Sequence, residues 1–255
     1  MNEVKQVSRT KKIAKIIGWT LLCLSPIYAL PLVFIAYISY NELLAAVVVR
    51  PIAKEYISEA YPDDDMYVAD VGFDFKGNSL YAKVQSSTST DTHFKIWYDL
   101  GWPEYISDTS DNIASGVNTF IRLQNEYNQL VQNASLDFEH LYSASATLLE
   151  YDSKTEKDGL RIEELILDTK FDILTYGAGY GYIRCRFIVP AEYISQEYAE
   201  ELIADYDRAL SNAGIYYKYI DLWLSSCDKD GEPNYSGDYI NIITGDVSEL
   251  FVDPK

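Results

Sequence analysis

The hydrophobic pattern of the chain begins with one long apolar segment. From Ile16 to Ile38 there are 23 residues without a charge. A helix of that length can cross a hydrocarbon core about 30 Å thick, because each residue advances the helix by about 1.5 Å. The pattern therefore predicts a transmembrane helix over residues 16–39, with the lipid bilayer as its partner.

Two other interpretations of this segment stay open, a cleavable signal peptide and a lipoprotein signal at Cys23. A signal peptide has an apolar region of about 7–15 residues and a small-x-small cleavage site. This apolar region is longer, and the following Tyr40-Asn41-Glu42 offers no such site. Leu22, before Cys23, is larger than the residue usual in a lipoprotein signal. We therefore favour an uncleaved anchor.

The charges beside the apolar segment predict its orientation. Residues 1–15 carry five basic residues and one acid, Glu3. Basic residues close to a span stay on the cytoplasmic side. The sequence thus predicts a cytoplasmic basic segment over residues 1–15, a single pass through the cell membrane, and an extracytoplasmic C-terminal part.

Residues 40–135 are predicted to form a first α+β unit of a helix, a three-strand meander and a second helix. Alternating apolar positions indicate antiparallel strands over residues 66–75, 79–86 and 93–100. Helical spacing predicts helices over residues 41–60 and 111–132. Pro51 should end or kink the first helix near Arg50 and stand in the first turn of a new one. We expect the second helix, capped by Asp111, to pack on the meander.

Residues 136–255 are predicted to form a second α+β unit. Residues 137–150 fit either a helix or a strand, and residues 176–181 a glycine-rich turn. The expected regular elements are strands over residues 182–189, 215–226 and 239–244, and a helix over residues 195–213. The fold class predicted for the whole chain is α+β, with one N-terminal transmembrane helix followed by two small mixed domains with antiparallel sheets.

The charge of the part after the span excludes one class of partner. The chain carries a formal net charge of −18, and residues 1–15 contribute +4, so the remainder carries −22. A surface this acidic does not bind nucleic acid, whose backbone is anionic. The acids solvate the surface and favour cationic partners.

Few residues suggest catalysis or metal binding. Asp91 and His93 could act as an oriented general base, but no Gly-x-Ser-x-Gly nucleophile motif accompanies them. His140 stands near Glu139 without zinc-ligand spacing, and Gly177-x-Gly179-x-Gly181 is followed by a strand pattern, which is wrong for a phosphate loop. We therefore assign no catalytic, cofactor-binding or metal-binding residue and expect a protein that is not an enzyme.

Two further features leave alternatives open. The acidic turns Asp63-Asp64-Asp65 and Asp228-x-Asp230-Gly231 could hold calcium or be solvated, and neither matches the twelve-residue calcium loop. Cys185 and Cys227 could form a disulfide in an oxidising compartment or remain free thiols.

One sequence pattern is similar to a known family. The segments KEYISEAYPD (Lys54–Asp63), DTHFKIWYDLGW (Asp91–Trp102) and VNTFIRLQNEYNQLV (Val117–Val131), after a single N-terminal span, resemble the YfjL-like family. Its members are uncharacterised single-span membrane proteins of Gram-positive bacteria. The resemblance covers roughly residues 10–135 and more loosely the second half, and it implies no activity and no site residue.

These patterns predict a membrane-anchored extracytoplasmic protein that works as a non-enzymatic binding or interaction module. Its partner would be a protein, a peptide or a cell-wall component. The alternatives are a hydrolase using Asp91 and His93, or an accessory subunit of a membrane complex in which Pro26 and Pro31 lie against another helix.

Overall fold

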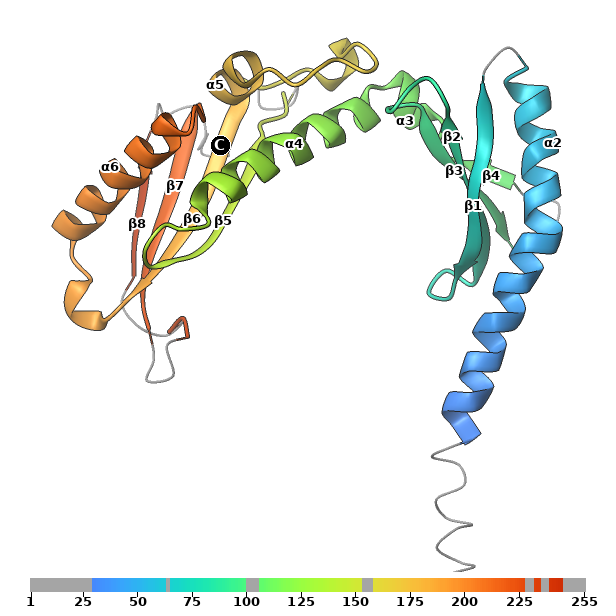
Figure 1. Cartoon of the computed structure of the whole chain (residues 1–255), viewed down its shortest axis with the longest axis horizontal. Helices are drawn as coiled ribbons and strands as arrows, with labels where there is room; N and C mark the ends of the chain where they lie inside the picture. Colours follow the sequence, from blue (N-terminus) through green and yellow to red (C-terminus); the bar gives the residue numbers. More distant parts are fainter. Residues whose placement is uncertain are drawn as a thin grey trace, which may run out of the picture. The chain divides into compact units, whose positions relative to one another are not determined.

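The chain folds into two compact α+β units, each built on a four-stranded sheet (Figure 1). The first unit contains residues 1–88 and 93–109, and the second contains residues 89–92 and 110–255. The computed structural model describes residues 29–62, 65–99, 106–152, 158–227, 232–234 and 239–244. The α+β class predicted from the sequence is confirmed, whereas the basic segment 1–15 and most of the predicted span lie outside the described residues.

A single continuous helix, Ala29–Ala60, leads into the first unit. Within the described part of the chain it is the one helix long and apolar enough to cross a membrane. A signal sequence near an N-terminus would meet the same two criteria, so length and composition do not separate it from an anchor.

Pro51 is accommodated by a change of helical pitch. A π-helical turn, η1 (Ala45–Val49), precedes α2 (Arg50–Ala60), and the Arg50 N–H donates to the carbonyl of Ala45, five residues back. Because proline lacks an N–H and its ring crowds the preceding turn, the wider π turn relieves both problems. Pro51 is in the first turn of α2 as predicted. Near Arg50, where an end or a kink was expected, the helix continues through a π-helical turn.

The first sheet is the predicted antiparallel meander with one more strand. Its strands are β1 (Met66–Asp74), β2 (Ser79–Ser86), β3 (His93–Asp99) and β4 (Ile106–Asp108), in that order. Val68, Val84 and Phe94 lie in one cross-strand row and are buried, as are Ala53 and Ile57 of α2. The three-residue β4 was not predicted, since so short a strand shows no periodicity.

The second sheet is mixed, which corrects the expectation of antiparallel pairing. Its strands run in the order β5 (Leu141–Leu148), β6 (Gly181–Val189), β7 (Tyr219–Ser226) and β8 (Tyr239–Thr244). β6 and β7 pair in parallel, and the other pairs are antiparallel. The helix α6 (Gln196–Asn212), capped by the Ser195 hydroxyl, connects β6 to β7. A helical crossover of this kind joins parallel strands.

The long helix predicted from residue 111 belongs to the second unit, and the expectation that it packs on the meander was wrong. It is split into α3 (Asp111–Ala114) and α4 (Val117–Ser135) by Gly116 in a left-handed conformation. Leu123, Tyr127 and Val131 of α4 are buried in the core that β5–β8 and α6 share. Figure 1 shows α4 running beside β5. Periodicity gives the apolar face of a helix but not the sheet it covers.

The remaining connections of the second unit are short helical turns. They are η2 (Ile162–Glu164), η3 (Ile173–Gly177), α5 (Ala178–Tyr180) and η4 (Ala191–Tyr193). The expected glycine-rich turn is therefore helical until it enters β6, and residues 137–150 contain the strand β5 rather than a helix. Cys185 is buried and Cys227 half-buried, both as free thiols.

Candidate functional site

A groove of about 510 Å³ lies between α2 and β1 in the first unit. Its volume falls within the range of about 300–1,000 Å³ typical of binding pockets. The residues that line it are Arg50, Lys54, Ile57, Ser58, Tyr61, Pro62, Met66, Tyr67 and Val68. These described lining residues include no histidine, cysteine or carboxylate, and their polar side chains are those of Arg50, Lys54, Ser58 and two tyrosines.

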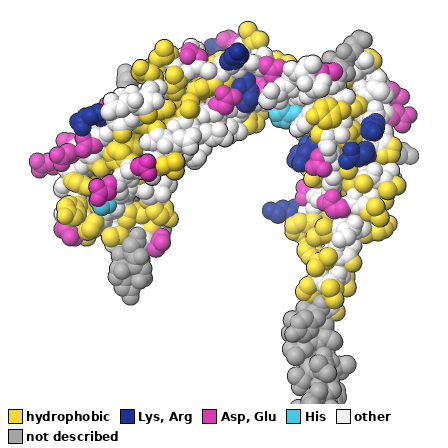
Figure 2. Space-filling view, in the orientation of Figure 1, with side chains coloured by type: hydrophobic (Ala, Val, Ile, Leu, Met, Phe, Trp, Pro, Cys, Tyr) yellow, Lys and Arg dark blue, Asp and Glu magenta, His cyan; other side chains and the backbone are white. Residues whose placement is uncertain are grey.

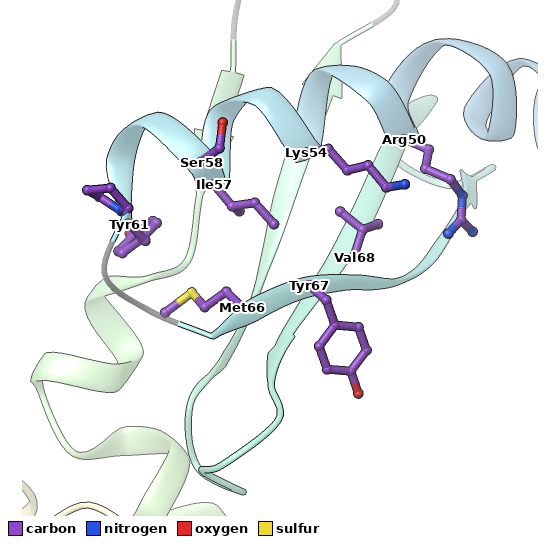
Figure 3. A pocket seen from close by; sticks show the side chains of 9 residues that line it. Arg50, Lys54, Ile57, Ser58, Tyr61, Met66, Tyr67 and Val68 are labelled. Carbon is purple, nitrogen blue, oxygen red and sulfur yellow. The ribbon is translucent and has the colours of Figure 1, made fainter.

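Two cations lie above an apolar floor in this groove. Arg50 and Lys54 are four residues apart on α2, a spacing that places both on one side of a helix. Figure 3 shows them above Val68 of β1, while Tyr67 points away from the helix. Ile57 and Val68, which face each other, are buried. The groove therefore offers positive charge beside a hydrophobic surface.

β1 is an edge strand, and side chains close only one half of its free edge. The Val71 N–H donates to the Asp70 carboxylate at 2.9 Å, and the Phe73 N–H donates to Glu42 at 3.3 Å. In the half from Met66 to Val68, which lines the groove, no described side chain bonds to the strand from that side. Natural proteins block exposed edges because an open edge pairs with another strand. The open half is thus a place where an extended chain can add.

Asp70, an acid on β1, is already engaged by a lysine. Lys83 Nζ lies 3.0 Å from Asp70 Oδ2. The Lys83 hydrogen bond is the main cause that lowers the pKa of Asp70, and the charge of Arg50 adds to it. Asp70 consequently stays ionised near neutral pH while its hydrogen bond to Lys83 leaves Arg50 and Lys54 to face the groove.

Charge is distributed unevenly over the two units. In Figure 2 Lys and Arg side chains appear on both units, and acidic side chains are prominent on the second. The helix α6 alone carries Glu197, Glu200, Glu201, Asp205 and Asp207. The chain is acidic as a whole, yet the groove presents two cations.

Asp91, half of the candidate catalytic pair, is an internal structural anchor of the second unit. Its buried carboxylate accepts from Arg122 Nε at 2.6 Å and Nη2 at 3.0 Å, and from the Asp168 N–H at 2.9 Å. Burial alone would raise the pKa of Asp91, but the Arg122 hydrogen bond and the other donors outweigh it and lower the pKa. His93 begins β3 of the first unit and is exposed. With its oxygens held in this way, Asp91 is not placed to orient a general base.

A second buried carboxylate lies in the sheet of the second unit. Asp221 of β7 accepts from Tyr182 at 2.6 Å, Arg184 at 2.9 Å and Asn241 at 2.6 Å. Burial would raise the pKa of Asp221, and the hydrogen bonds, led by that of Tyr182, lower it instead. These partners lie on β6 and β8, so the carboxylate joins three strands and is satisfied without a ligand.

The other sequence candidates are not brought together into a site. His140 Nε2 lies 3.6 Å from Glu139 Oε1, and no group of three potential metal ligands occurs among the described residues. A Cβ added to Gly181 would lie 2.3 Å from the Tyr127 hydroxyl, so this glycine permits close packing. Of the acidic turns, Asp65 accepts from the Ser86 and Ser87 hydroxyls, and the remaining aspartates lie outside the described residues.

Comparison with known proteins gives little that bears on this chain. No family model matches it, and no curated protein matches it. Among solved structures it is similar to the crystal structure of a DUF5037 family protein from Ruminococcus gnavus, with 14% identity. The match covers 77% of this chain and 91% of that chain, with a TM-score of 0.23, a likeness too weak to support an argument. The resemblance to the YfjL-like family stays a prediction.

Arg50 and Lys54 were not predicted from the sequence as site residues. Their spacing of four residues on a helix beside the apolar segment was the available signal. That spacing occurs on many solvated helices, and only the position of β1 opposite them makes a groove.

Proposed function

We propose that this protein is a membrane-anchored, extracytoplasmic, non-enzymatic binding module, and that the groove between α2 and β1 binds an extended acidic peptide. The observation that carries the proposal is the open half of the β1 edge beside Arg50 and Lys54. An extended peptide that adds to a sheet edge gains backbone hydrogen bonds, and its alternate side chains enter neighbouring pockets.

The chemistry of the groove defines the peptide. An aliphatic side chain would pack over Ile57 and Val68, which form the buried floor. The next acidic side chain would reach Arg50 or Lys54. Because these two side chains are not deeply buried, their attraction for an acid should be weakened by salt. Binding should therefore be tightest at low ionic strength.

The anchor is supported by the apolar surface of the N-terminal helix. Leu30, Leu32, Val33 and Ile35 are all exposed in a helix that would be expected to bury such residues in water. These residues lie on several sides of the helix, so packing against one protein surface would not cover them all. Lipid surrounds a helix and would cover every side. The basic residues before the span, which lie outside the described residues, would keep the N-terminus in the cytoplasm.

The peptide proposal is tested with two probes on the full chain in nanodiscs. An N-acetylated, fluorescent hexapeptide of alternating Val and Asp is the probe, and alternating Val and Lys is its counterpart. We expect saturable binding of the acidic peptide at low salt that depends on Arg50 and Lys54, whereas attraction of the basic peptide to the acidic surface should not depend on them. No binding of the acidic peptide, or binding that does not depend on these two residues, would refute the acidic-peptide assignment.

Matched variants locate the binding site. Arg50→Gln with Lys54→Gln should abolish binding of the acidic probe. Lys95→Gln with Lys170→Gln removes the same charge from exposed positions outside the groove lining and should leave binding unchanged. If the two double variants lose binding equally, the attraction is general and the groove is not the site.

Anchoring is tested separately by extraction and by reporter fusions. The protein should stay with membranes in alkaline carbonate, and a reporter after Lys255 should be active only outside the cytoplasm. Replacing Lys11, Lys12 and Lys15 with glutamate should reduce the fraction of protein inserted in the predicted orientation. A reporter active only in the cytoplasm would contradict the orientation.

A second candidate function, an accessory subunit of a membrane complex, is favoured by one observation. Tyr40, Leu43 and Val47 are exposed and follow a spacing of three and four residues along the N-terminal helix. Such a stripe can pack against a partner helix. Cysteine crosslinking from Leu43 to a second protein in native membranes would support it, and migration as a monomer in native gels would count against it.

A further inference from the structure

The turn between β1 and β2 lies beside the apolar helix that leads into the first unit. The Phe75 ring lies 5.8 Å from that of Phe34, edge to face. The Tyr37 ring lies 5.5 Å from that of Phe73, and its hydroxyl donates to Asn78 Oδ1 at 2.7 Å. In Figure 1 the helix continues past the end of this hairpin toward its N-terminus. The turn is therefore held at a fixed level along the helix.

The environment that the helix requires changes at this level. On the N-terminal side Leu30, Leu32 and Val33 are exposed. From Asn41 onward one side of the helix is buried, first by Asn41 and then by Ala45 and Val49. The first stretch requires an apolar surrounding and the second packs on a sheet.

Polar groups in the turn limit how deep it can lie. Asp74, Lys76 and Asn78 would be costly inside the hydrocarbon core, where charged and polar side chains are strongly destabilised. The hydrocarbon boundary must therefore lie on the N-terminal side of Tyr37, near Phe34. Residues 16–33 are 18 residues long, which corresponds to about 27 Å of helix. That length still crosses a thin bilayer or one that thins locally, so the span ends earlier than residue 39.

We infer that the turn Phe75–Asn78 is a second membrane contact, in which Phe75 enters the lipid interface beside Phe34 and Lys76 binds the phosphate of an anionic lipid headgroup. The inference rests on the proposed membrane anchor. Phe75 is 54% exposed at the end of the hairpin, although its ring already contacts the apolar helix. Phe side chains of membrane-surface segments insert at the boundary between headgroups and acyl chains, and Lys76, also exposed, precedes the glycine of the turn.

Two contacts would hold the first unit in one orientation. A single helix leaves a domain free to rotate about the helix axis, whereas a turn docked on the lipid removes that freedom. The groove would then face a constant direction relative to the membrane.

The inference is tested with an environment-sensitive fluorophore at single cysteines in the full chain. Cys23 and Cys227 are replaced by Ser, and Cys185 is kept because it is buried and burial raises the pKa of its thiol. NBD is attached at Phe75→Cys or at Tyr67→Cys, in nanodiscs with brominated acyl chains. Tyr67 is 47% exposed, close to the exposure of Phe75, and lies about 25 Å along the same strand.

We expect brominated lipid to quench NBD at position 75 at least threefold more than at position 67. Lys76→Glu should reduce that quenching in phosphatidylglycerol but not in phosphatidylcholine, and Lys95→Glu should change neither. Circular dichroism establishes that each labelled variant folds. If the protein resists carbonate extraction yet both labels are quenched equally weakly, the turn contact is refuted and the anchor stands. If carbonate extracts the protein, the proposed anchor and this inference both fail.

Discussion

At the scale of single residues, Asp91 shows how a polar side chain that resembles a catalytic group can be structural. The Asp91 side chain is 1% exposed, and Arg122 donates hydrogen bonds to both of its carboxylate oxygens. Arg122 also donates to Glu126 and to the carbonyl of Thr169. The network ties residues 89–92 to α4 and to the loop at Asp168.

Replacing Asp91 should destabilise the second unit. Removing one partner of a buried ion pair lowers the free energy of unfolding by about 3–5 kcal/mol. We expect the lower value, about 3 kcal/mol, for Asp91→Asn, because Arg122 still pairs with Glu126 and is partly exposed to solvent. Asp205→Asn is the control, since its pair with Arg208 is exposed and should change stability by less than about 1 kcal/mol. Thermal melts measure both, and equal small shifts would show that the network is not structural.

The same residue predicts how stability depends on pH. The pKa of Asp91 is lower in the folded protein than its ordinary value of about 3.9. A lowered folded pKa contributes stability that is present above the unfolded pKa and is lost as the pH falls through the folded pKa. Stability should therefore decline below about pH 4, and Asp91→Asn should flatten that decline in acid titrations followed by circular dichroism. An unchanged acid transition in this variant would contradict the assignment.

At the scale of elements, Gly116 decides where one helix becomes two. Its φ is +76°, and an added Cβ would lie 2.2 Å from the carbonyl oxygen of Ile162. Gly214, after α6, has a φ of +72° with no heavy atom within 4 Å of the added Cβ. The two glycines therefore share a backbone conformation and differ in the space around them.

A matched pair of alanine variants separates those two effects. Each should cost about 1–2 kcal/mol for the left-handed conformation. Gly116→Ala should cost at least about 1 kcal/mol more, because backbone must move, and that lowers the melting temperature by a further 2–4 °C or so. Differential scanning calorimetry makes the comparison. Equal melting temperatures would show that the backbone at Ile162 moves away from the added methyl group without a loss of stability.

At the scale of the whole molecule, the described part of the N-terminal helix becomes buried only near the end of the apolar segment. The buried residues of the N-terminal helix start at Asn41 and continue with Ala45, Val49 and Ala53. Of the described residues before Asn41, Phe34 and Tyr37 contact the β1–β2 hairpin near its turn. The fold of both units should therefore survive without the first 40 residues.

A chain that starts at Asn41 is expected to be soluble and folded, with a net charge of −22. Its circular dichroism spectrum should show mixed helix and strand, and amide exchange should quicken in the turn 75–78, which has lost Phe34 and Tyr37. Faster exchange throughout the first sheet, or an aggregated product in size-exclusion chromatography, would mean that the apolar helix is part of the fold.

What the sequence determined by itself was local. Alternation marked β1, β2, β3 and β6, and helical spacing marked α4 and α6, because burial of one face repeats every two or about 3.6 residues wherever the element ends up. The apolar segment identified a span candidate for the same reason, since hydrocarbon requires a continuous run. These patterns need no knowledge of distant residues.

What only the tertiary structure decided was which elements meet. The helix α4 packs in the core of the second unit, and β6 and β7 pair in parallel. Asp91 binds Arg122, which is 31 residues away in the sequence. The groove likewise exists because Arg50 and Lys54 face β1. A side chain's neighbours across a core depend on the packing of the whole chain, and the periodicity of one element carries no information about them.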